Sequence, residues 1–144
     1  MEQTMTRIDF YTNVADRIQY ACRLARKARA ARCRIVMLTT PEDIDALDLA
    51  LWSVADDAFL PHVRATDSLA AQTPIILSDK HTDELPHHEV LINLTDSTPS
   101  HFARFERLLE VVPGSESEKN AGRARYTYYK ERGYPLSHFI AEST

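Results

Sequence analysis

Glycine is scarce in this chain, and its positions argue against one large class of function. The 144 residues contain three glycines, Gly114, Gly122 and Gly133, and none precedes position 114. Loops that hold the phosphates of a nucleotide need glycine at the first turn from strand to helix, because the backbone must approach the ligand closely. The corresponding stretch here reads FYTNVADR (residues 10–17). The sequence therefore predicts no nucleotide-binding loop of the Rossmann or P-loop type.

Catalytic and metal-binding patterns are also missing. The six histidines are scattered apart from the adjacent pair His87 and His88, whose side chains would point to opposite sides of a strand. No pair of Cys or His has the spacing of a zinc site, and no GxSxG turn presents a nucleophile. A small α/β enzyme would need a pocket with converging titratable groups, which the sequence does not display. We therefore expect no catalytic residue, no metal and no cofactor.

Export and membrane insertion are not indicated either. No apolar run approaches the roughly 20 residues of a membrane span. The N-terminal MEQTMTRIDF lacks the apolar segment of a secretory signal. Cys22 and Cys33 do not form a CxxC motif, and we expect both to be buried thiols. Together these features favour a cytoplasmic protein.

The charge of the chain is unevenly distributed. The net charge is −4, yet residues 13–34 carry seven Lys or Arg and one acid, and residues 119–134 carry five and one. The intervening residues 35–118 carry sixteen acids and four basic residues. A general nucleic-acid binder would be basic overall. An acidic protein with local basic faces indicates a specific anionic partner.

Alternating strand and helix patterns predict a single α/β domain over residues 1–144, a three-layer sandwich around a mostly parallel, Rossmann-like sheet. RIVMLT (34–39) is a nearly continuous apolar run, typical of a central parallel strand. The other expected strands are 8–11, 58–63, 74–78, 90–95 and, as the last, 108–113.

Four helices are expected between these strands. Asn13 would cap a helix that runs to about Ala31, and Thr40, followed by Pro41, would cap a second one. Pro99 would open a short helix over 98–106. Ser115 would begin a capping box with Glu118 and a final helix to about Arg132.

The second helix has more apolar residues than one core face can use. With Ile44 at zero and about 100° per residue, Leu47 and Leu51 fall within about 60°, whereas Trp52 lies about 80° and Leu49 about 140° away. FLPH (59–62) follows Trp52 closely. Two interpretations remain open: Trp52 and Phe59 belong to the core, or they form an apolar interface for another subunit.

The final helix gathers positive charge and aromatic rings. Lys119, Arg123, Tyr126 and Lys130 share one face within about 60°, because they are spaced i, i+4, i+7 and i+11. Ala121, Ala124 and Tyr128 lie opposite and are the candidates for packing. The basic face is either an ordinary solvated surface or a cationic patch for a peptide carboxylate, an Asp- and Phe-rich peptide or a nucleotide strand.

The order of these segments resembles a known family. DALDLALWS (45–53) and FLPH, then PIILS, VLINL, LLEVVP and KNAGRARYTYYKERGY (119–134), are similar to the chi subunit of bacterial DNA polymerase III over nearly the whole chain. The most specific pieces are ALW followed by FLPH, and a final helix of the form K-x3-R-x-R-Y-x2-Y.

The resemblance implies a non-catalytic accessory protein of the clamp-loader assembly. Chi forms a heterodimer with the psi subunit, which attaches it to the clamp loader, and chi also binds the acidic, Phe-terminated tail of the single-stranded DNA-binding protein. DNA would be contacted mainly indirectly, and a membrane not at all. The psi-facing residues implied here are Leu49, Trp52, Phe59, Pro61 and His62. The tail-binding residues implied are Lys119, Arg123, Tyr126, Tyr129 and Lys130.

One departure and one alternative accompany this reading. Thr127 stands where the family commonly has a basic residue, which would weaken the tail site unless Lys130 or Arg125 compensates. The alternative is a module that binds single-stranded or primer-template DNA directly with the same helix.

Overall fold

The computed structural model of the protein describes residues 5–53, 60–80 and 85–141. Seven strands form one sheet in the order β3-β4-β2-β5-β6-β1-β7, and every pairing in the described part of the chain is parallel. The strands are β1 (Arg7–Val14), β2 (Ile35–Leu38), β3 (His62–Arg64), β4 (Ile75–Ser78), β5 (Val90–Asn93), β6 (Arg107–Pro113) and β7 (Leu136–Ile140). The predicted α/β class and parallel sheet are confirmed.

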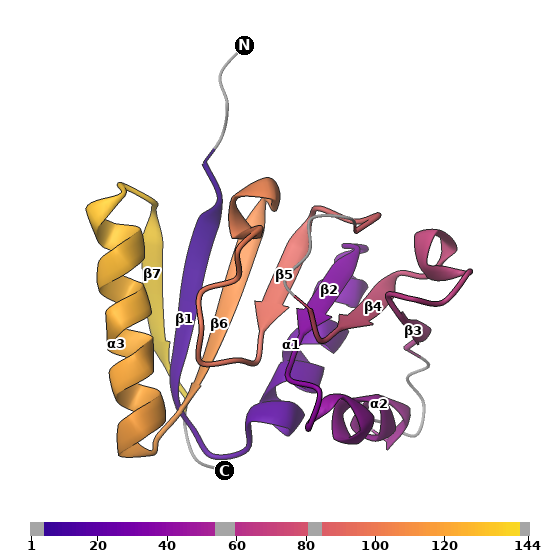
Figure 1. Ribbon diagram of the computed structural model, residues 1–144, viewed down its shortest axis with the longest axis horizontal. Helices are drawn as coiled ribbons and strands as arrows, with labels where there is room; N and C mark the ends of the chain where they lie inside the picture. Colours follow the sequence, from indigo (N-terminus) through magenta and orange to yellow (C-terminus); the bar gives the residue numbers. More distant parts are fainter. Residues whose placement is uncertain (1–4, 54–59, 81–84, 142–144) are drawn as a thin grey trace.

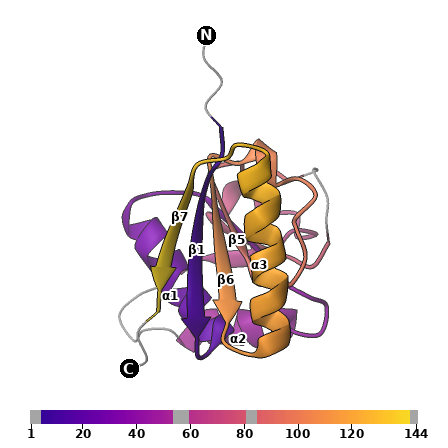
Figure 2. The same ribbon diagram turned by 90° about the vertical axis from the view of Figure 1, so that its left-hand side faces the viewer.

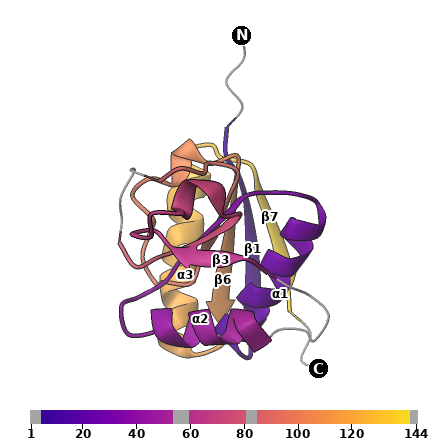
Figure 3. The ribbon, with the colours of Figure 1, turned by 90° about the vertical axis from the view of Figure 1, so that its right-hand side faces the viewer.

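Among the described residues, three α-helices cover the two faces of this sheet. They are α1 (Arg17–Ala30), α2 (Ile44–Ser53) and α3 (Glu116–Glu131). Helices α1 and α2 share one apolar cluster with one face of the sheet, whereas α3 packs on the other face. Figures 1 and 2 show α3 beside the β6, β1 and β7 end of the sheet, with α1 on the opposite side. Figure 3 shows the same separation from the β3 edge.

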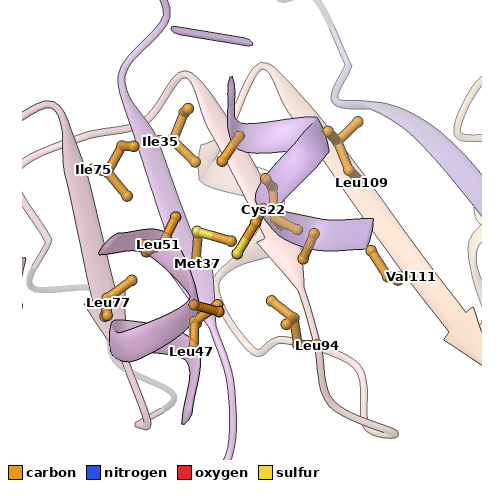
Figure 4. Packing of buried hydrophobic residues seen from close by; sticks show 14 of the residues in the cluster. Cys22, Ile35, Met37, Leu47, Leu51, Ile75, Leu77, Leu94, Leu109 and Val111 are labelled. Carbon is orange, nitrogen blue, oxygen red and sulfur yellow. The ribbon is translucent and has the colours of Figure 1, made fainter. Parts of the chain in front are cut away.

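The core below α1 and α2 consists of side chains from the central strands (Figure 4). Met37 of β2 lies between Leu47 and Leu51 of α2 and Cys22 of α1, and all four are almost completely buried. The predicted α2 stripe is therefore confirmed. Burial raises the pKa of the Cys22 thiol to about 12, so this cysteine stays protonated and inert. Cys33 is a free thiol and only partly buried.

The first two helices begin later than predicted. Strand β1 continues to Val14, and Asn13 adopts a positive φ of 58° instead of capping α1. Asp16 is the N-cap, and its Oδ1 accepts a hydrogen bond from the Gln19 amide at 3.1 Å. Helix α2 starts at Ile44, after a turn over residues 41–43. Asn and Asp are comparable N-caps, so the sequence did not identify which of Asn13 and Asp16 would cap α1. The choice depends on where strand β1 ends, because Asn13 still belongs to the strand.

Other boundaries also differ from the prediction. The segment 98–106 forms only a short 3-10 turn, η2 (Phe102–Arg104), and its two phenylalanines, Phe102 and Phe105, are both buried in one apolar cluster. Strand β3 begins at His62, and residues 58–59 of the predicted strand lie outside the described residues. Strand β6 is not the last one, because β7 follows α3 and pairs with β1.

Helix α3 begins and ends as its sequence indicates. The Ser115 hydroxyl accepts a hydrogen bond from the Glu118 amide and donates one to the Glu118 carboxylate at 2.7 Å. At the other end Gly133 adopts a φ of +80°, and the Tyr134 amide donates to the Tyr129 carbonyl. This is the Schellman arrangement, for which glycine is the favoured residue. It turns the chain back into β7.

The face of α3 that packs on the sheet is not the predicted one. Gly122, Arg125 and Tyr129 are buried, whereas Ala124 and Tyr128 are exposed and Ala121 is only partly buried. A Cβ atom at position 122 would lie 2.8 Å from Cγ1 and 3.1 Å from Cγ2 of Val112. Glycine therefore lets the helix approach β6 closely.

A buried ionic cluster holds this face of α3 against the sheet. Glu110 of β6 accepts hydrogen bonds from Arg125 Nε at 3.1 Å, from the Tyr129 hydroxyl at 2.7 Å and from Asn93 Nδ2 at 2.9 Å. Burial raises the pKa of Glu110, and the charge of Arg125 and the hydrogen bonds from Tyr129 and Asn93 oppose that rise. Burial and the adjacent Glu110 raise the pKa of Tyr129 as well, so its hydroxyl remains a donor.

We predict that Glu110→Gln lowers the free energy of unfolding by about 3–5 kcal/mol, because it leaves the Arg125 charge buried without its counter-ion. The double variant Glu110→Met with Arg125→Met should recover most of this loss, since it removes both charges. Urea denaturation measures both. A loss of less than about 1 kcal/mol in the free energy of unfolding of Glu110→Gln would contradict this role of the pair Glu110 and Arg125.

Candidate functional site

A groove of about 620 Å³ lies between α3 and the end of the sheet. Its floor comes from β1 and β6, one wall from α3 and the other wall from β7. Lys119, Arg123 and Tyr126, all predicted from the sequence as parts of one site, line this groove together. The other lining residues are Phe10, Thr12, Asn13, Val112, Pro113, Gly122, Thr127, His138 and Ile140.

The cations of the groove belong to α3. Among the described residues, the one polar side-chain contact of Arg123 is from Nη1 to Asn120 Oδ1 at 3.5 Å, so its guanidinium has no carboxylate partner. Lys119 lies 3.8 Å from Glu116, which is highly exposed. Exposed pairs of this kind contribute little stability. Both cations are thus available for an anionic ligand.

Apolar surface lies directly beside these charges. The rings of Phe10 and Tyr126 meet edge to face, with 5.2 Å between their centroids. Ile140 of β7 is 69% exposed and lines the opposite wall. Below them Val112 contacts the helix at Gly122. The groove can therefore hold an aromatic or aliphatic side chain next to an anionic group.

His138 adds a polar group to the β7 wall. Its Nε2 lies 2.6 Å from Thr12 Oγ1, and this hydrogen bond joins β7 to β1 within the groove. Its backbone is paired with Phe10. The side chains of His138 and Ile140 point to the same face of the sheet, as expected two residues apart on a strand.

Two of the predicted tail-binding residues lie elsewhere. Tyr129 is completely buried and bound to Glu110, so it is a core residue and not part of the groove. Lys130 is exposed on α3 but does not line the groove. Arg125, considered as a replacement for a basic residue at Thr127, is buried with Glu110. Thr127 itself lines the groove.

A second surface lies on α2. Leu49 is 68% and Trp52 58% exposed, and one helical turn separates them. The structure therefore excludes the interpretation that Trp52 belongs to the core. The Trp52 ring packs against the ring of His62, with 4.7 Å between their centroids.

His62 lies below this tryptophan and is buried. Its Nε2 contacts Asp48 Oδ1 at 2.7 Å, and its Nδ1 contacts the Leu60 carbonyl, also at 2.7 Å. These two contacts fix the imidazole ring, which in turn supports the Trp52 ring. His62 is thus a supporting residue of the surface. Pro61 is partly buried beside it, and Phe59 lies outside the described residues.

The described residues offer no alternative site for a metal or a membrane. No group of three or more His, Cys, Asp or Glu in that part of the chain is arranged to hold a metal ion. None of the helices described is long and apolar enough to cross a bilayer.

Sequence reasoning missed the half of the groove that β1, β6 and β7 supply. Residues 136–140 are mostly exposed, so they carry no strong apolar pattern. The available signal was positional: Gly133 ends α3, and the short run that follows contains Phe139 and Ile140, which favour strands.

The fold and these surfaces define a parallel α/β domain with one cationic, apolar groove and one exposed tryptophan surface. Comparison with known proteins identifies the family to which this domain belongs. The family described as "DNA polymerase III chi subunit, HolC" matches residues 5–137. The "DNA polymerase III subunit chi" of Pseudomonas aeruginosa is 34% identical over 137 residues, which cover 92% of this chain and 94% of the relative.

More distant relatives carry the same description. The "DNA polymerase III subunit chi" of Haemophilus influenzae is 26% identical over 83% of each chain, and that of Escherichia coli is 25% identical over 83% of this chain and 82% of its own. The chain therefore belongs to the chi subunit family of DNA polymerase III, as its sequence indicated. Membership associates it with DNA replication.

We predict that Trp52→Ala changes the free energy of unfolding by no more than about 0.5 kcal/mol, because surface substitutions outside the core are nearly neutral. The matched control is Leu51→Ala at the adjacent buried position, which should cost about 2–5 kcal/mol. Urea denaturation compares the two. A loss from Trp52→Ala as large as that from Leu51→Ala would identify Trp52 as a core residue.

Proposed function

We propose that the protein is a non-catalytic, cytoplasmic subunit that links the clamp loader of DNA polymerase III to the single-stranded DNA-binding protein. In this proposal the psi subunit binds the α2 surface, formed by Leu49 and Trp52. The acidic C-terminal tail of the single-stranded DNA-binding protein binds the groove between α3 and β7.

The observation that carries the proposal is the convergence of Lys119, Arg123 and Tyr126 on one groove with an apolar floor. A tail that ends in Phe presents a terminal carboxylate, acidic side chains and one ring close together. The groove offers a matching set, with two cations on α3 and apolar surface from Phe10 and Ile140.

Arg123 has the central role in this recognition. A guanidinium binds a carboxylate through two parallel hydrogen bonds, which a lysine cannot reproduce. Arg123 lies one turn from Lys119 and about one turn from Tyr126, so the terminal carboxylate at Arg123 would leave the ring beside Tyr126. The stems of the two basic side chains extend the apolar surface.

The affinity of one tail should be modest and should fall with salt, because exposed charges contribute much of it. Many tails displayed on one coated DNA strand would raise the effective affinity without new contacts. The complex would thereby prefer coated DNA to free single-strand-binding protein.

The α2 surface suits an obligate partner better than a charged tail. Large exposed apolar side chains such as Trp dominate the energy of protein interfaces. The His62 ring, held by Asp48 and the Leu60 carbonyl, keeps the Trp52 ring in a defined position before a partner binds. A preordered anchor loses less entropy on association.

We predict that Arg123→Ala weakens binding of the tail peptide about ten- to a hundred-fold, because a charge-assisted contact contributes roughly 1.5–3 kcal/mol. Arg123→Lys should recover only part of this loss. Calorimetry with the peptide, and with the same peptide amidated at its C-terminus, measures both contributions.

The matched control is Lys130→Ala, which removes an exposed cation of the same helix outside the groove and should leave tail binding close to wild type. Psi binding, thermal stability and any binding of oligo-dT should be the same for Arg123→Ala as for the wild type. If Arg123→Ala retains tail binding but loses oligo-dT binding, the helix binds DNA directly and the proposed function is wrong.

We predict the converse result for the other surface. Trp52→Ala should reduce psi binding by about 2 kcal/mol or more while tail affinity stays unchanged. Because the two surfaces lie on opposite faces of the sheet, the tail should bind free chi and the chi–psi pair with similar affinity. A large drop in tail affinity after psi addition would show that the two sites overlap.

A further inference from the structure

A third surface, on the side of the sheet opposite the groove, combines unpaired cations with a row of aromatic rings. Helix α1 and the residues just after it carry five exposed Lys or Arg: Arg23, Arg26, Lys27, Arg32 and Arg34. None of the five has a carboxylate within salt-bridge distance in the described part of the chain. The one basic side chain of α1 that does is Arg17, at the start of the helix.

Aromatic rings continue this charged surface across the sheet. Tyr20 of α1 packs against Tyr11 of β1, with 5.7 Å between their centroids. Tyr11 is in turn stacked on Phe139 of β7 at 5.3 Å, with 20° between the ring planes. The guanidinium of Arg23 lies over the Tyr20 ring at 5.5 Å. We call Tyr20, Tyr11 and Phe139 the aromatic row.

The cations and the row share one side of the molecule. Tyr20, Arg23 and Lys27 are spaced i, i+3 and i+7, so they fall within about 60° on α1. Phe139, which is 49% exposed, forms the open end of the row. Its side chain points away from the groove, because its neighbours His138 and Ile140 point into the groove. Figure 2 shows α1 and α3 on opposite sides of β7 and β1.

We infer that this surface binds the backbone and bases of single-stranded DNA. Non-specific single-strand sites combine a positive surface that follows the phosphates with aromatic side chains on which bases stack. Here Arg23 and Lys27 would contact consecutive phosphates, and a base would stack on the exposed Phe139 ring. The flanking Arg26 extends the positive surface along the strand.

Two features favour a nucleotide strand over an acidic protein segment. Acidic side chains by themselves do not stack on a flat exposed ring, whereas every base of a nucleotide strand has a π-face that does. The chain as a whole is acidic, so the five exposed cations of this helix and its end form a local positive surface. The binding of DNA to this surface is weak and occurs in addition to the binding of protein partners. It does not depend on the tail binding proposed above.

The test is fluorescence anisotropy with labelled oligo-dT of about 20 nucleotides, titrated at several salt concentrations. The wild type should bind at low salt. Arg23→Gln with Lys27→Gln should make the negative slope of log K against log salt shallower by about 1.4, since each phosphate contact on a single strand contributes about −0.7. The matched control is Lys130→Gln with Arg132→Gln, which removes the same charge from exposed positions at the C-terminal end of α3 and should leave the slope unchanged.

A second pair of variants tests the stacked base. Phe139→Leu, which keeps an apolar side chain without a ring, should weaken oligo-dT binding at least about fivefold, and Phe139→Tyr should retain it. Circular dichroism melting curves establish that each variant is folded.

Three outcomes would overturn the inference. They are no binding of oligo-dT by the wild type at low salt, an unchanged slope in the α1 variant, and competition by poly-glutamate of equal charge as effective as that by oligo-dT. The last outcome would identify an acidic protein segment as the ligand. Tail binding should be unaffected by every variant of this surface. A failure of this inference can therefore be distinguished from a failure of the proposed tail site.

Discussion

The carboxylate of Glu110 lies in the middle of β6 with no exposure to solvent, and the arrangement of α3 depends on it. Arg125 and Tyr129, one helical turn apart, donate to its two different oxygens, and Asn93 donates from the neighbouring strand. A rotation of α3 about its axis would break both contacts and leave an unpaired charge in the core. Such a cluster specifies one orientation of the helix, which apolar contacts alone would not.

The groove is a consequence of that orientation. With Arg125 and Tyr129 directed at the sheet, the next positions around the helix, Arg123 and Tyr126, lie along its edge and face β7. Gly122 brings this part of α3 within contact distance of Val112, so the cations lie close to the apolar floor. The same buried pair that orders the core thus places a charged side chain beside Phe10, although neither Glu110 nor Arg125 lines the groove.

The sequence predicted the elements of the fold better than the rotation of this helix. Strand β2 is a continuous apolar run and β5 is apolar except for Asn93, and any parallel sheet would bury such strands. Helix α3 instead packs through a glycine, an arginine and a tyrosine, whose burial depends on a carboxylate in another strand. Periodicity favoured Ala121, Ala124 and Tyr128, because a single-sequence pattern contains no information about that tertiary partner.

Part of the site was nevertheless predictable. Residues spaced i, i+4 and i+7 share a helix face whichever way the helix is turned, so Lys119, Arg123 and Tyr126 were correctly grouped. Tyr129 was not, because its place depends on the rotation that Glu110 imposes. Strand β7 was missed for a related reason: an edge strand with mostly exposed side chains has no apolar alternation, and its pairing with β1 is what defines it.

Strand β7 also connects the two faces of the sheet. Because side chains alternate along a strand, Ile140 lines the groove and Phe139 joins the aromatic row on the other face. The described part of β7 pairs on one side only, with β1. A ligand in the groove and a ligand on the Phe139 ring would therefore contact opposite faces of one strand, so neither ligand needs the side chains that the other one uses.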